Sequence, residues 1–552
     1  MGAARTQGAG NTSRRSLARS VAPSAESVSS SAPLALLVIY SVLAVPYLLW
    51  RATVVNLDVW FGPVLYVAEL YGILSTVLFL WMTRVIIVPR HRPARPSTVD
   101  AFICTCNEPL GVLRPTVRGA VAVRGIRSVF VLDDGSRPEV RELAQALGAG
   151  YLARGTNEHA KAGNLNHGLR HSDAEFLLLL DADHVPAPHF LERTLGQLDD
   201  PRVAFVQTPQ IYHNRDTFLF RLGRHGPWSE QGMFYDCIQP AKNRSNSAFF
   251  VGTSAVMRRA ALNSIGGFAT GTATEDIHTS LQLHARGWSS VFVPEALAFG
   301  LEAENLKEFY RQRRRWAAGS LGLLLRSPDS PLRARGLTAA QRFSYLSATL
   351  AHAQGPQRLV FLLTPLLCVL TLSAPVDGSL TTFIAIAFGY TLFGIYAISR
   401  YSRGTYHPLF TECYALANAV AQCAALTALI RVDRKFSVSR KSVARGESTW
   451  VKSMLTICCT VSALGAAAAF ARLALGEPGH EPLLIGAAVL LLINFLLLAS
   501  FLLYLNRYER QPPLVVQSPL DPPGEPEMIA LSQRRADILS GPALATPPGT
   551  SI

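Results

Sequence analysis

The chain has few charged residues for its length, and this scarcity excludes a wholly soluble protein. Only 16% of its 552 residues are charged, whereas soluble domains carry about 25%. Hydrophobic residues make up 49%, which excludes intrinsic disorder of the whole chain. Lysine is scarcest, with 6 residues, so arginine supplies most of the positive charge behind the formal net charge of +14. Such a surplus suits an anionic membrane face, a phosphorylated substrate or nucleic acid.

Metal-binding and disulfide patterns of cysteine are also missing. The eight cysteines include Cys104-x-Cys106 and the adjacent Cys458 and Cys459, but no C-x-x-C spacing. Neither a zinc site nor a disulfide framework is therefore indicated, and we expect a reducing compartment. The chain has no glycine-rich P-loop, which argues against a membrane transporter or receptor with a nucleotide-binding domain.

Long apolar runs stand near both ends of the chain, and a membrane span needs about 20 apolar residues. We expect six spans: Ala35–Trp50, Phe61–Met82, Leu359–Leu372, Leu380–Ile398, Val451–Leu475 and Leu483–Leu505. The apolar segment Leu409–Ile430 carries Glu412, Asn418 and Gln422, so we interpret it as an interfacial helix. Thr338–Leu350 has a similar, weaker character.

Composition divides the chain into five parts. We expect disordered tails at 1–32 and 506–552, two spans within 33–82, a polar α/β region at 95–330, and interface helices, a loop at 434–445 and four spans within 331–505. The loops near 374–379 and 476–481 have no Lys or Arg, whereas arginines cluster in the N-terminal tail, at 84–96, in the polar region, at 400–445 and at 507–510. The positive-inside rule therefore predicts that both termini and the polar region face the cytoplasm.

In the polar region, short apolar runs alternate with helical patterns, which indicates a mostly parallel sheet. The runs Val99–Thr105, Ser128–Leu132 and Phe176–Leu180 read as strands. The second is followed by Asp133-Asp134-Gly135-Ser136 and the third by Asp181-Ala182-Asp183. Because such sheets bind ligands at the carboxyl ends of their strands, the acidic residues stand where a site is expected.

Four motifs could carry chemistry, although each alone has an ordinary structural explanation. Asp181 and Asp183 could hold Mg²⁺ or Mn²⁺ and a diphosphate, or form an acidic turn. Asp133-Asp134-Gly135 is also a common turn, and Thr274-Glu275-Asp276 could cap a helix. Gln312-Arg313-Arg314-Arg315-Trp316 could lie on lipid. Their order and spacing together are more specific than any one of them.

That order resembles the processive family 2 glycosyltransferases, and most closely the bacterial cellulose synthase catalytic subunit. Further blocks of the resemblance are Thr105–Pro109, His159–Asn166, Val206–Pro209 and Phe249–Thr253. The segment Phe436–Lys441 resembles the gating loop of these synthases, with Ser439 where Thr is usual. The resemblance implies a GT-A-type, Rossmann-like α/β glycosyltransferase domain on the cytoplasmic side, inserted in an α-helical polytopic protein of the inner (plasma) membrane.

The resemblance also implies residue roles. The catalytic set would be Asp133, Asp181, Asp183 and Asp276, with Asp276 as the general base. A UDP-sugar donor would be held by Thr105, Glu108, Asp133, Lys161, Asp181 and Arg315, and the Mg²⁺ or Mn²⁺ by Asp181 and Asp183. A growing polysaccharide would contact Trp316, Gln312, His184 and Thr253. The gating loop would act through Phe436, Val438, Ser439 and Lys441.

The implied activity is inverting, processive synthesis of a β-linked glucan from UDP-glucose, with β-1,4 linkage favoured and translocation of the product across the membrane. Alternatives are a β-1,3, mixed-linkage or other β-polysaccharide, or transfer of one sugar to a lipid acceptor. Gln210 stands where the family usually has His. The part after Arg510 is too short and proline-rich for a PilZ domain, so we expect no in-chain activation by cyclic di-GMP. Expected partners are the donor, the polysaccharide and membrane lipids, with accessory secretion subunits possible and no nucleic acid.

Overall fold

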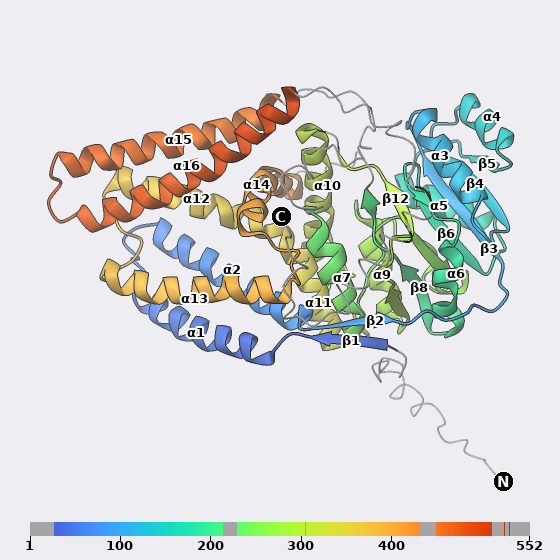
Figure 1. Ribbon diagram of the computed structural model, residues 1–552, viewed down its shortest axis with the longest axis horizontal. Coiled ribbons are helices and arrows are strands. Elements are labelled where there is room, and N and C mark those ends of the chain that lie inside the picture. Colours follow the sequence, from blue (N-terminus) through green and yellow to red (C-terminus); the bar gives the residue numbers. More distant parts are fainter. Residues whose placement is uncertain are drawn as a thin grey trace, which may run out of the picture.

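The computed structural model of the chain describes residues 27–212, 229–303, 305–430 and 449–510, with residues 524 and 529. Long helices from both the N-terminal and the C-terminal parts of the chain lie side by side at one end of the molecule (Figure 1). An α/β domain lies at the other end, and a layer of further helices separates the two. The expected gating loop, Phe436–Lys441, lies outside the described residues.

A seven-stranded sheet forms the centre of the α/β domain. Its strand order is β11 (Ser289–Phe292), β8 (Val203–Gln207), β10 (Ala255–Arg258), β6 (Phe176–Asp181), β3 (Val99–Thr105), β4 (Ser128–Asp133) and β5 (Gly150–Ala153). Strand β10 is antiparallel to both of its neighbours, and the other pairings are parallel. The three strands expected from the sequence are present and adjacent.

Alternate residues of the central strands face two different cores, so the sheet is covered on both sides. In β3, Ala101 and Ile103 contribute to one cluster and Phe102 to the other. Helices α3 (Leu110–Val121), α4 (Pro138–Ala146) and α6 (Phe190–Thr194) supply the first cluster. Helices α5 (Ala160–Arg170), α8 (Arg259–Ile265) and α9 (Glu275–Ala285) supply the second. Burial on both faces explains why Phe176–Leu180 is a continuous apolar run.

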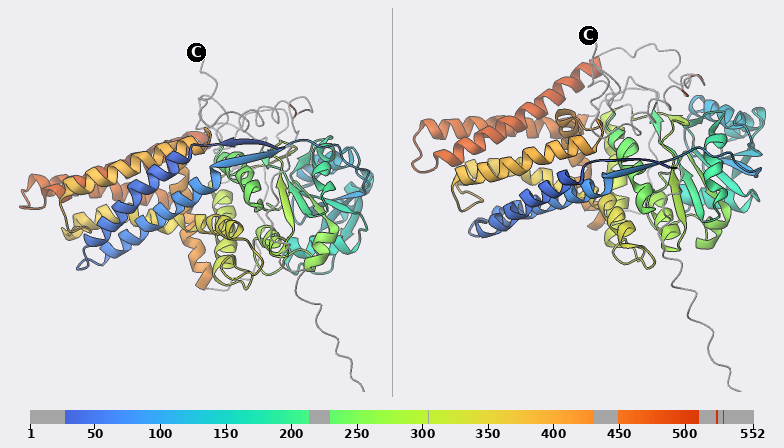
Figure 2. Two further views of the ribbon diagram at one scale, coloured as in Figure 1. Left: turned by 90° about the horizontal axis from the view of Figure 1, so that it is seen from below. Right: turned by 60° about the horizontal axis from the view of Figure 1, so that its bottom comes forward.

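Smaller elements flank the sheet. A second sheet has the order β7 (Val185–Pro186), β12 (Ala298–Gly300) and β9 (Ile211–Tyr212). Short helical segments are η1 (Leu195–Asp199), η2 (Phe234–Ile238), α7 (Gln239–Lys242), η3 (Asn243–Ser245) and η4 (Ala351–Ala353). Helices α10 (Leu306–Leu325), α11 (Ala339–Leu350) and α14 (Pro408–Ile430) lie between the α/β domain and the long helices (Figures 1 and 2).

The long helices are α1 (Leu34–Thr53), α2 (Phe61–Thr83), α12 (Gln354–Thr371), α13 (Leu380–Tyr401), α15 (Thr449–Ala474) and α16 (Glu481–Arg510). Within the described residues, six helical stretches are long and apolar enough to cross a membrane: Leu34–Thr53, Phe61–Thr83, Ala339–Thr371, Pro408–Thr427, Trp450–Ala474 and Glu481–Glu509. Arg51 Nε and Glu69 Oε2 lie 3.0 Å apart, buried between α1 and α2.

The number of candidate spans agrees with the sequence-based expectation, but one member differs. Pro408–Thr427, which we interpreted as interfacial, meets the length and hydropathy requirement, and the expected span Leu380–Ile398 is not among the six found in the described residues. In the views, however, α13 runs alongside α1, whereas α14 crosses the direction of the long helices beside α10 (Figure 2). Its composition therefore suits α14 to a membrane span, whereas its position agrees with an interfacial helix.

The ordered chain extends further at both ends than we expected. Ser27–Ser31, assigned to a disordered tail, forms strand β1, which pairs antiparallel with β2 (Val85–Pro89). The apolar strand β2 directly follows α2, and its backbone forms hydrogen bonds with β1. Composition does not reveal this pairing. At the other end, residues 506–510 continue α16, because Tyr508 is buried and Glu509 pairs with Lys452 of α15.

Lys242 joins the α/β domain to α11 through a buried contact. Its ammonium donates to Ser344 O at 3.0 Å and to Ser344 Oγ at 2.7 Å, and the side chain is fully buried. Burial lowers the pKa of Lys242 to about 7. An unfolded lysine titrates near 10.4, so between these values the unfolded chain binds a proton that the folded chain lacks. Stability therefore rises with pH across this window.

Replacing Lys242 with Met should raise the thermal unfolding temperature at pH 7, because it removes the cost of burying a titratable ammonium. The gain should shrink as the pH rises from about 7 towards about 9.5, and thermal unfolding of the detergent-solubilised protein measures it. Lys307→Met, at an exposed site on α10, is the control and should show no such trend. A gain that is constant with pH would contradict the assignment.

Candidate active site

The carboxyl ends of neighbouring parallel strands bring the predicted acidic residues to one edge of the sheet. Thr105 pairs with Asp133 across β3 and β4, and Cys104 pairs with Asp181 across β3 and β6. Strand β8 runs in the same direction and ends at Gln207. A cleft opens at this edge, and it is completed by the first turn of α9 and by residues of α10.

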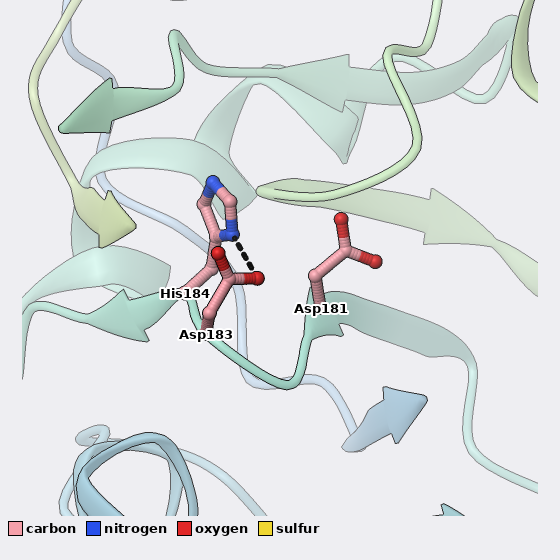
Figure 3. A group of neighbouring side chains, drawn as sticks. All are labelled: Asp181, Asp183 and His184. Atoms are coloured by element: carbon pink, nitrogen blue, oxygen red, sulfur yellow. Dashed lines mark hydrogen bonds and ion pairs between the residues drawn. The ribbon is translucent and has the colours of Figure 1, made fainter. Parts of the chain in front are cut away.

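Asp181, Asp183 and His184 form a group that could hold a metal ion (Figure 3). One ligand atom from each residue lies within 4.8 Å of the others. Asp183 and His184 are buried; His184 Nδ1 lies 3.2 Å from Asp183 Oδ1, and the buried His184 Nε2 has no hydrogen-bond partner among the described residues. Two carboxylates and an imidazole suit a hard to borderline divalent ion. The residues present therefore fit a divalent metal.

His184, which we expected at the acceptor, lines the same cleft as Trp316 and stands beside the two carboxylates that could hold a metal ion. Strand β12 explains how it fits: a Cβ at Gly300 would lie 2.5 Å from His184 Nε2, so only glycine permits this approach. The sequence signal that we passed over is direct adjacency, since His184 immediately follows Asp183.

Lys161 ties the first carboxylate to the opposite wall of the cleft. Its ammonium forms an ion pair with Asp181 and donates to Gly252 O at 2.6 Å. Burial alone would lower the pKa of Lys161, but the carboxylates of Asp181 and Glu275 outweigh it and hold the pKa above its usual value. Lys161 thus stays cationic beside the position where a diphosphate would lie.

Thr253 supports Asp181 from behind. It is fully buried, and its Oγ1 accepts a hydrogen bond from the Asp181 backbone N–H at 2.9 Å. The described residues that line the cleft include Gly252 but not Thr253. Thr253, which we expected at the acceptor, fixes the backbone of the D-x-D turn in the structure.

Glu108 and Arg137 close the turn that follows β3. Glu108 Oε2 accepts from Thr105 Oγ1 at 2.7 Å and from the Cys106 backbone N–H at 2.8 Å. Arg137 donates to Thr105 Oγ1 at 2.7 Å and to Glu108 O at 2.7 Å. Thr105 and Glu108 both line the cleft, as expected of donor-binding residues.

Asp133 holds together the turn that follows β4, and it is not among the described residues that line the cleft. It is fully buried, and its carboxylate accepts from the Gly135 N–H at 3.0 Å, the Arg137 N–H at 2.8 Å and the Tyr151 hydroxyl at 3.1 Å. The neighbouring Asp134 lines the cleft instead, and Arg154 holds it at 2.9 Å. Of the two adjacent aspartates, the sequence alone does not reveal which one faces the ligand.

Asp276 stands in the first turn of α9 and lines the cleft. Burial raises the pKa of Asp276 to about 7, and the charge of Glu275 adds to the shift. Two effects oppose this rise in pKa. The Ile277 N–H donates a hydrogen bond to the Asp276 carboxylate at 2.8 Å, and Lys161 and Arg315 are positively charged. A carboxylate with this pKa is suited to general acid–base chemistry near neutral pH.

Helix α10 contributes Gln312, Arg315 and Trp316 to the same cleft. The helix can come this close because residue 319 is glycine: a Cβ there would lie 2.5 Å from Thr274 Cγ2. The Q-x-x-R-W segment therefore packs directly against the T-E-D turn. One cleft thus brings together all three motifs, D-x-D, T-E-D and Q-x-x-R-W.

Several cleft residues were absent from the expected set. They are Asp134, Asn157, Asn164, Tyr212 and Glu275, together with Gln210, which we had noted only as a departure. Gln210 donates to Val251 O at 2.9 Å and accepts from the Tyr212 hydroxyl at 2.7 Å. Tyr212 belongs to β9, a strand of only two residues, so its approach to the cleft has no signal in the sequence.

Comparison with known proteins shows which family and which proteins the chain is similar to. Residues 176–398 match the model of the family described as Glycosyl transferase family group 2. Cellulose synthase 1 of Komagataeibacter xylinus is 36% identical over 426 residues, which cover 73% of this chain and 27% of that protein. The cellulose synthase catalytic subunit [UDP-forming] of Pseudomonas fluorescens (strain SBW25) is 35% identical over 69% of this chain and 53% of its own length.

Among solved structures, a mannosyltransferase from Pyrobaculum calidifontis in complex with GDP-Man and Mn²⁺ is similar at a TM-score of 0.48 and 18% identity, over 68% of this chain and 99% of that chain. The chain spans about a quarter to about half of the length of the curated relatives named above. The structure confirms the expected architecture, in which an α/β domain is joined to apolar helices that could span a membrane.

Replacing Asp183 with Asn should weaken binding of Mn²⁺ at least about tenfold, because a neutral amide takes the place of a buried anionic ligand. Electron paramagnetic resonance of free Mn²⁺ titrated with the purified protein measures the affinity. Asp173→Asn is the control, since the Asp173 side chain is 83% exposed and pairs with Arg127. Equal Mn²⁺ affinity in the Asp183 variant and the wild type would exclude Asp183 as a ligand.

Proposed function

Because the chain carries a family 2 glycosyltransferase domain and resembles cellulose synthases, we propose that it is a membrane-embedded, inverting and processive glycosyltransferase. It polymerises glucose from UDP-glucose into a β-linked glucan, with β-1,4 linkage favoured, and passes the product across the membrane. The observation that carries this proposal is the cleft in which Asp181 and Asp183, Asp276, and Arg315 and Trp316 converge.

The donor half of the cleft suits a nucleoside diphosphate sugar. Thr105 and Glu108 line the end where the uridine would bind, and Lys161 and Arg315 provide positive charge for the diphosphate. Asp181 and Asp183, with His184, would hold Mg²⁺ or Mn²⁺. When bound, the ion neutralises charge that develops on the departing UDP.

The acceptor half supplies the base. The hydroxyl of the terminal sugar attacks the anomeric carbon, and its proton passes to the Asp276 carboxylate. The bond from the anomeric carbon to the diphosphate oxygen breaks, and UDP leaves with that electron pair. One displacement inverts the α-linked donor to a β-glycoside, so no covalent enzyme intermediate is needed. Trp316, with Gln312 nearby, would support the acceptor sugar by stacking.

The apolar helices suit a protein of the inner (plasma) membrane, with the α/β domain and both termini on the cytoplasmic side. Residues 95–330 would then be the catalytic domain, and residues 331–505 would provide the interface helices and part of the membrane path. The segment Phe436–Lys441, outside the described residues, would act as the gating loop. A reducing cytoplasm agrees with the eight free cysteines.

The proposed activity is tested in inverted membrane vesicles supplied with labelled UDP-sugars and Mg²⁺ or Mn²⁺. High-mass product from UDP-glucose that a β-1,4-glucanase digests would support the proposal. Product cut only by a β-1,3-glucanase would overturn the linkage, and product from another donor would overturn the sugar. Label found only in lipid extracts would overturn processivity in favour of single-sugar transfer.

Replacing Asp276 with Asn should reduce polymer synthesis by at least about a thousandfold, because the acceptor proton loses its base. Binding of UDP should stay nearly intact, since the substitution preserves size, and isothermal titration with UDP checks this. Glu295→Gln, on a carboxylate that pairs with Arg193 outside the cleft, is the control. Loss of UDP affinity in the Asp276 variant would instead assign Asp276 to nucleotide binding.

The rate at low donor concentration should rise with pH through about 7, since the raised pKa of Asp276 keeps the base protonated below that value. Each further unit of acidity should lower kcat/KM about tenfold. Initial rates of UDP release between about pH 5.5 and pH 8.5 measure the profile. A flat profile across this range would contradict Asp276 as the base with a raised pKa.

A further inference from the structure

Arg313 of α10 lies between two aromatic rings, those of Phe309 and Trp316. Its guanidinium carbon is 4.8 Å from the centre of the Phe309 ring and 4.4 Å from that of the Trp316 ring. Phe309 and Trp316 are four residues before and three residues after Arg313, so the three side chains share one helix face. This places a planar cation directly against the indole that lines the cleft.

Glu230 fixes the guanidinium in that position. The two side chains form an ion pair between α10 and the segment before η2, and they are only 5% (Arg313) and 19% (Glu230) exposed. Separating the two partners of a buried ion pair would leave each charge buried and unpaired, which is energetically costly. The pair therefore resists displacement. Arg313 is therefore held from one side by a carboxylate and from the others by aromatic rings.

Arg313 is not itself a cleft residue. Of the described residues of α10, those that line the cleft are Gln312, Arg315 and Trp316. Arg313 therefore reaches the cleft only through the indole that it contacts. Lysine could not replace it in this arrangement, because an ammonium lacks the planar surface that packs against a ring.

We propose that Arg313 is a positioning residue for the acceptor: it fixes the plane of the Trp316 indole and so sets the orientation in which the terminal sugar presents its hydroxyl to Asp276. This inference rests on the proposed function. Stacking on a ring orients a sugar only if the ring itself is immobile, and a displacement of about 1 Å at a reacting group can cost a factor of about 100 in rate. Glu230 acts in the same unit by keeping Arg313 in place.

The test compares the wild type with Arg313→Lys and with the double variant Arg313→Met/Glu230→Gln, which removes both buried charges together. Arg311→Met is the matched control, because Arg311 is on the same helix but is exposed and pairs with Glu308. Three quantities are measured in nanodiscs: KM for UDP-glucose, the length distribution of the polymer, and the affinity for a β-1,4-linked glucose oligosaccharide. Thermal unfolding checks that each variant is folded.

We expect the affinity for the oligosaccharide to fall about tenfold and the polymer to shorten in both Arg313 variants, while KM for UDP-glucose changes less than about twofold. In a Trp316→Ala background the same Arg313 substitutions should have no further effect on oligosaccharide affinity, since they act through the indole. Arg311→Met should match the wild type in every measurement.

Two results would overturn the inference. One is an oligosaccharide affinity in folded Arg313→Lys equal to that of the wild type. The other is additive effects of the Arg313 and Trp316 substitutions, which would assign Arg313 a role independent of the indole. A wild type that makes no polymer and binds no oligosaccharide would instead overturn the proposed function, so the two failures are distinguishable.

Discussion

The structure depends on a concentration of negative charge that the topology of the sheet imposes. Parallel strands end at one edge, so Asp133, Asp134, Asp181 and Asp183 all lie there, and α9 adds Glu275 and Asp276 to the same region. Carboxylates that share a poorly hydrated space repel one another, and each must be paired, bonded or protonated. All three cases occur at this edge, and the way in which each carboxylate is stabilised determines its chemical role.

Asp133 is neutralised by backbone N–H groups and Arg137, which makes it a structural closure of its turn. Asp181 is paired with Lys161, an interaction that a metal ion and a diphosphate could share. Asp276 accepts a hydrogen bond from the Ile277 N–H, but burial outweighs this bond and raises the pKa of Asp276 to about 7. Under the proposed function, the same residue type would therefore stabilise a turn, bind a metal ion or act as a base, according to its neighbours.

The sequence predicted those parts of the site that follow from local pattern and strand direction. Continuous apolar runs fixed the position of β3, β4 and β6, and the rule that parallel strands end at one edge brought Asp133 and Asp181 together. It did not reveal which of Asp133 and Asp134 faces the cleft, because that depends on Arg137 and Arg154 from later segments. Nor did it give the place of His184, which requires a glycine in β12, 116 residues along the chain.

The two halves of the cleft are formed by different structural elements. This difference determines which half could vary among related enzymes. The donor half rests on strand ends and their hydrogen-bonded turns, whose positions are fixed by the sheet. The acceptor half rests on α10, whose position depends on its close approach to Thr274 and on the pair Arg313–Glu230. Under the proposed function, linkage depends on which sugar hydroxyl reaches Asp276. Small shifts of α10 would therefore change the linkage, whereas the part of the donor site that rests on the strand ends would stay in place. Sequence differences around residues 230, 313 and 319 are accordingly the place where specificity for linkage would be encoded.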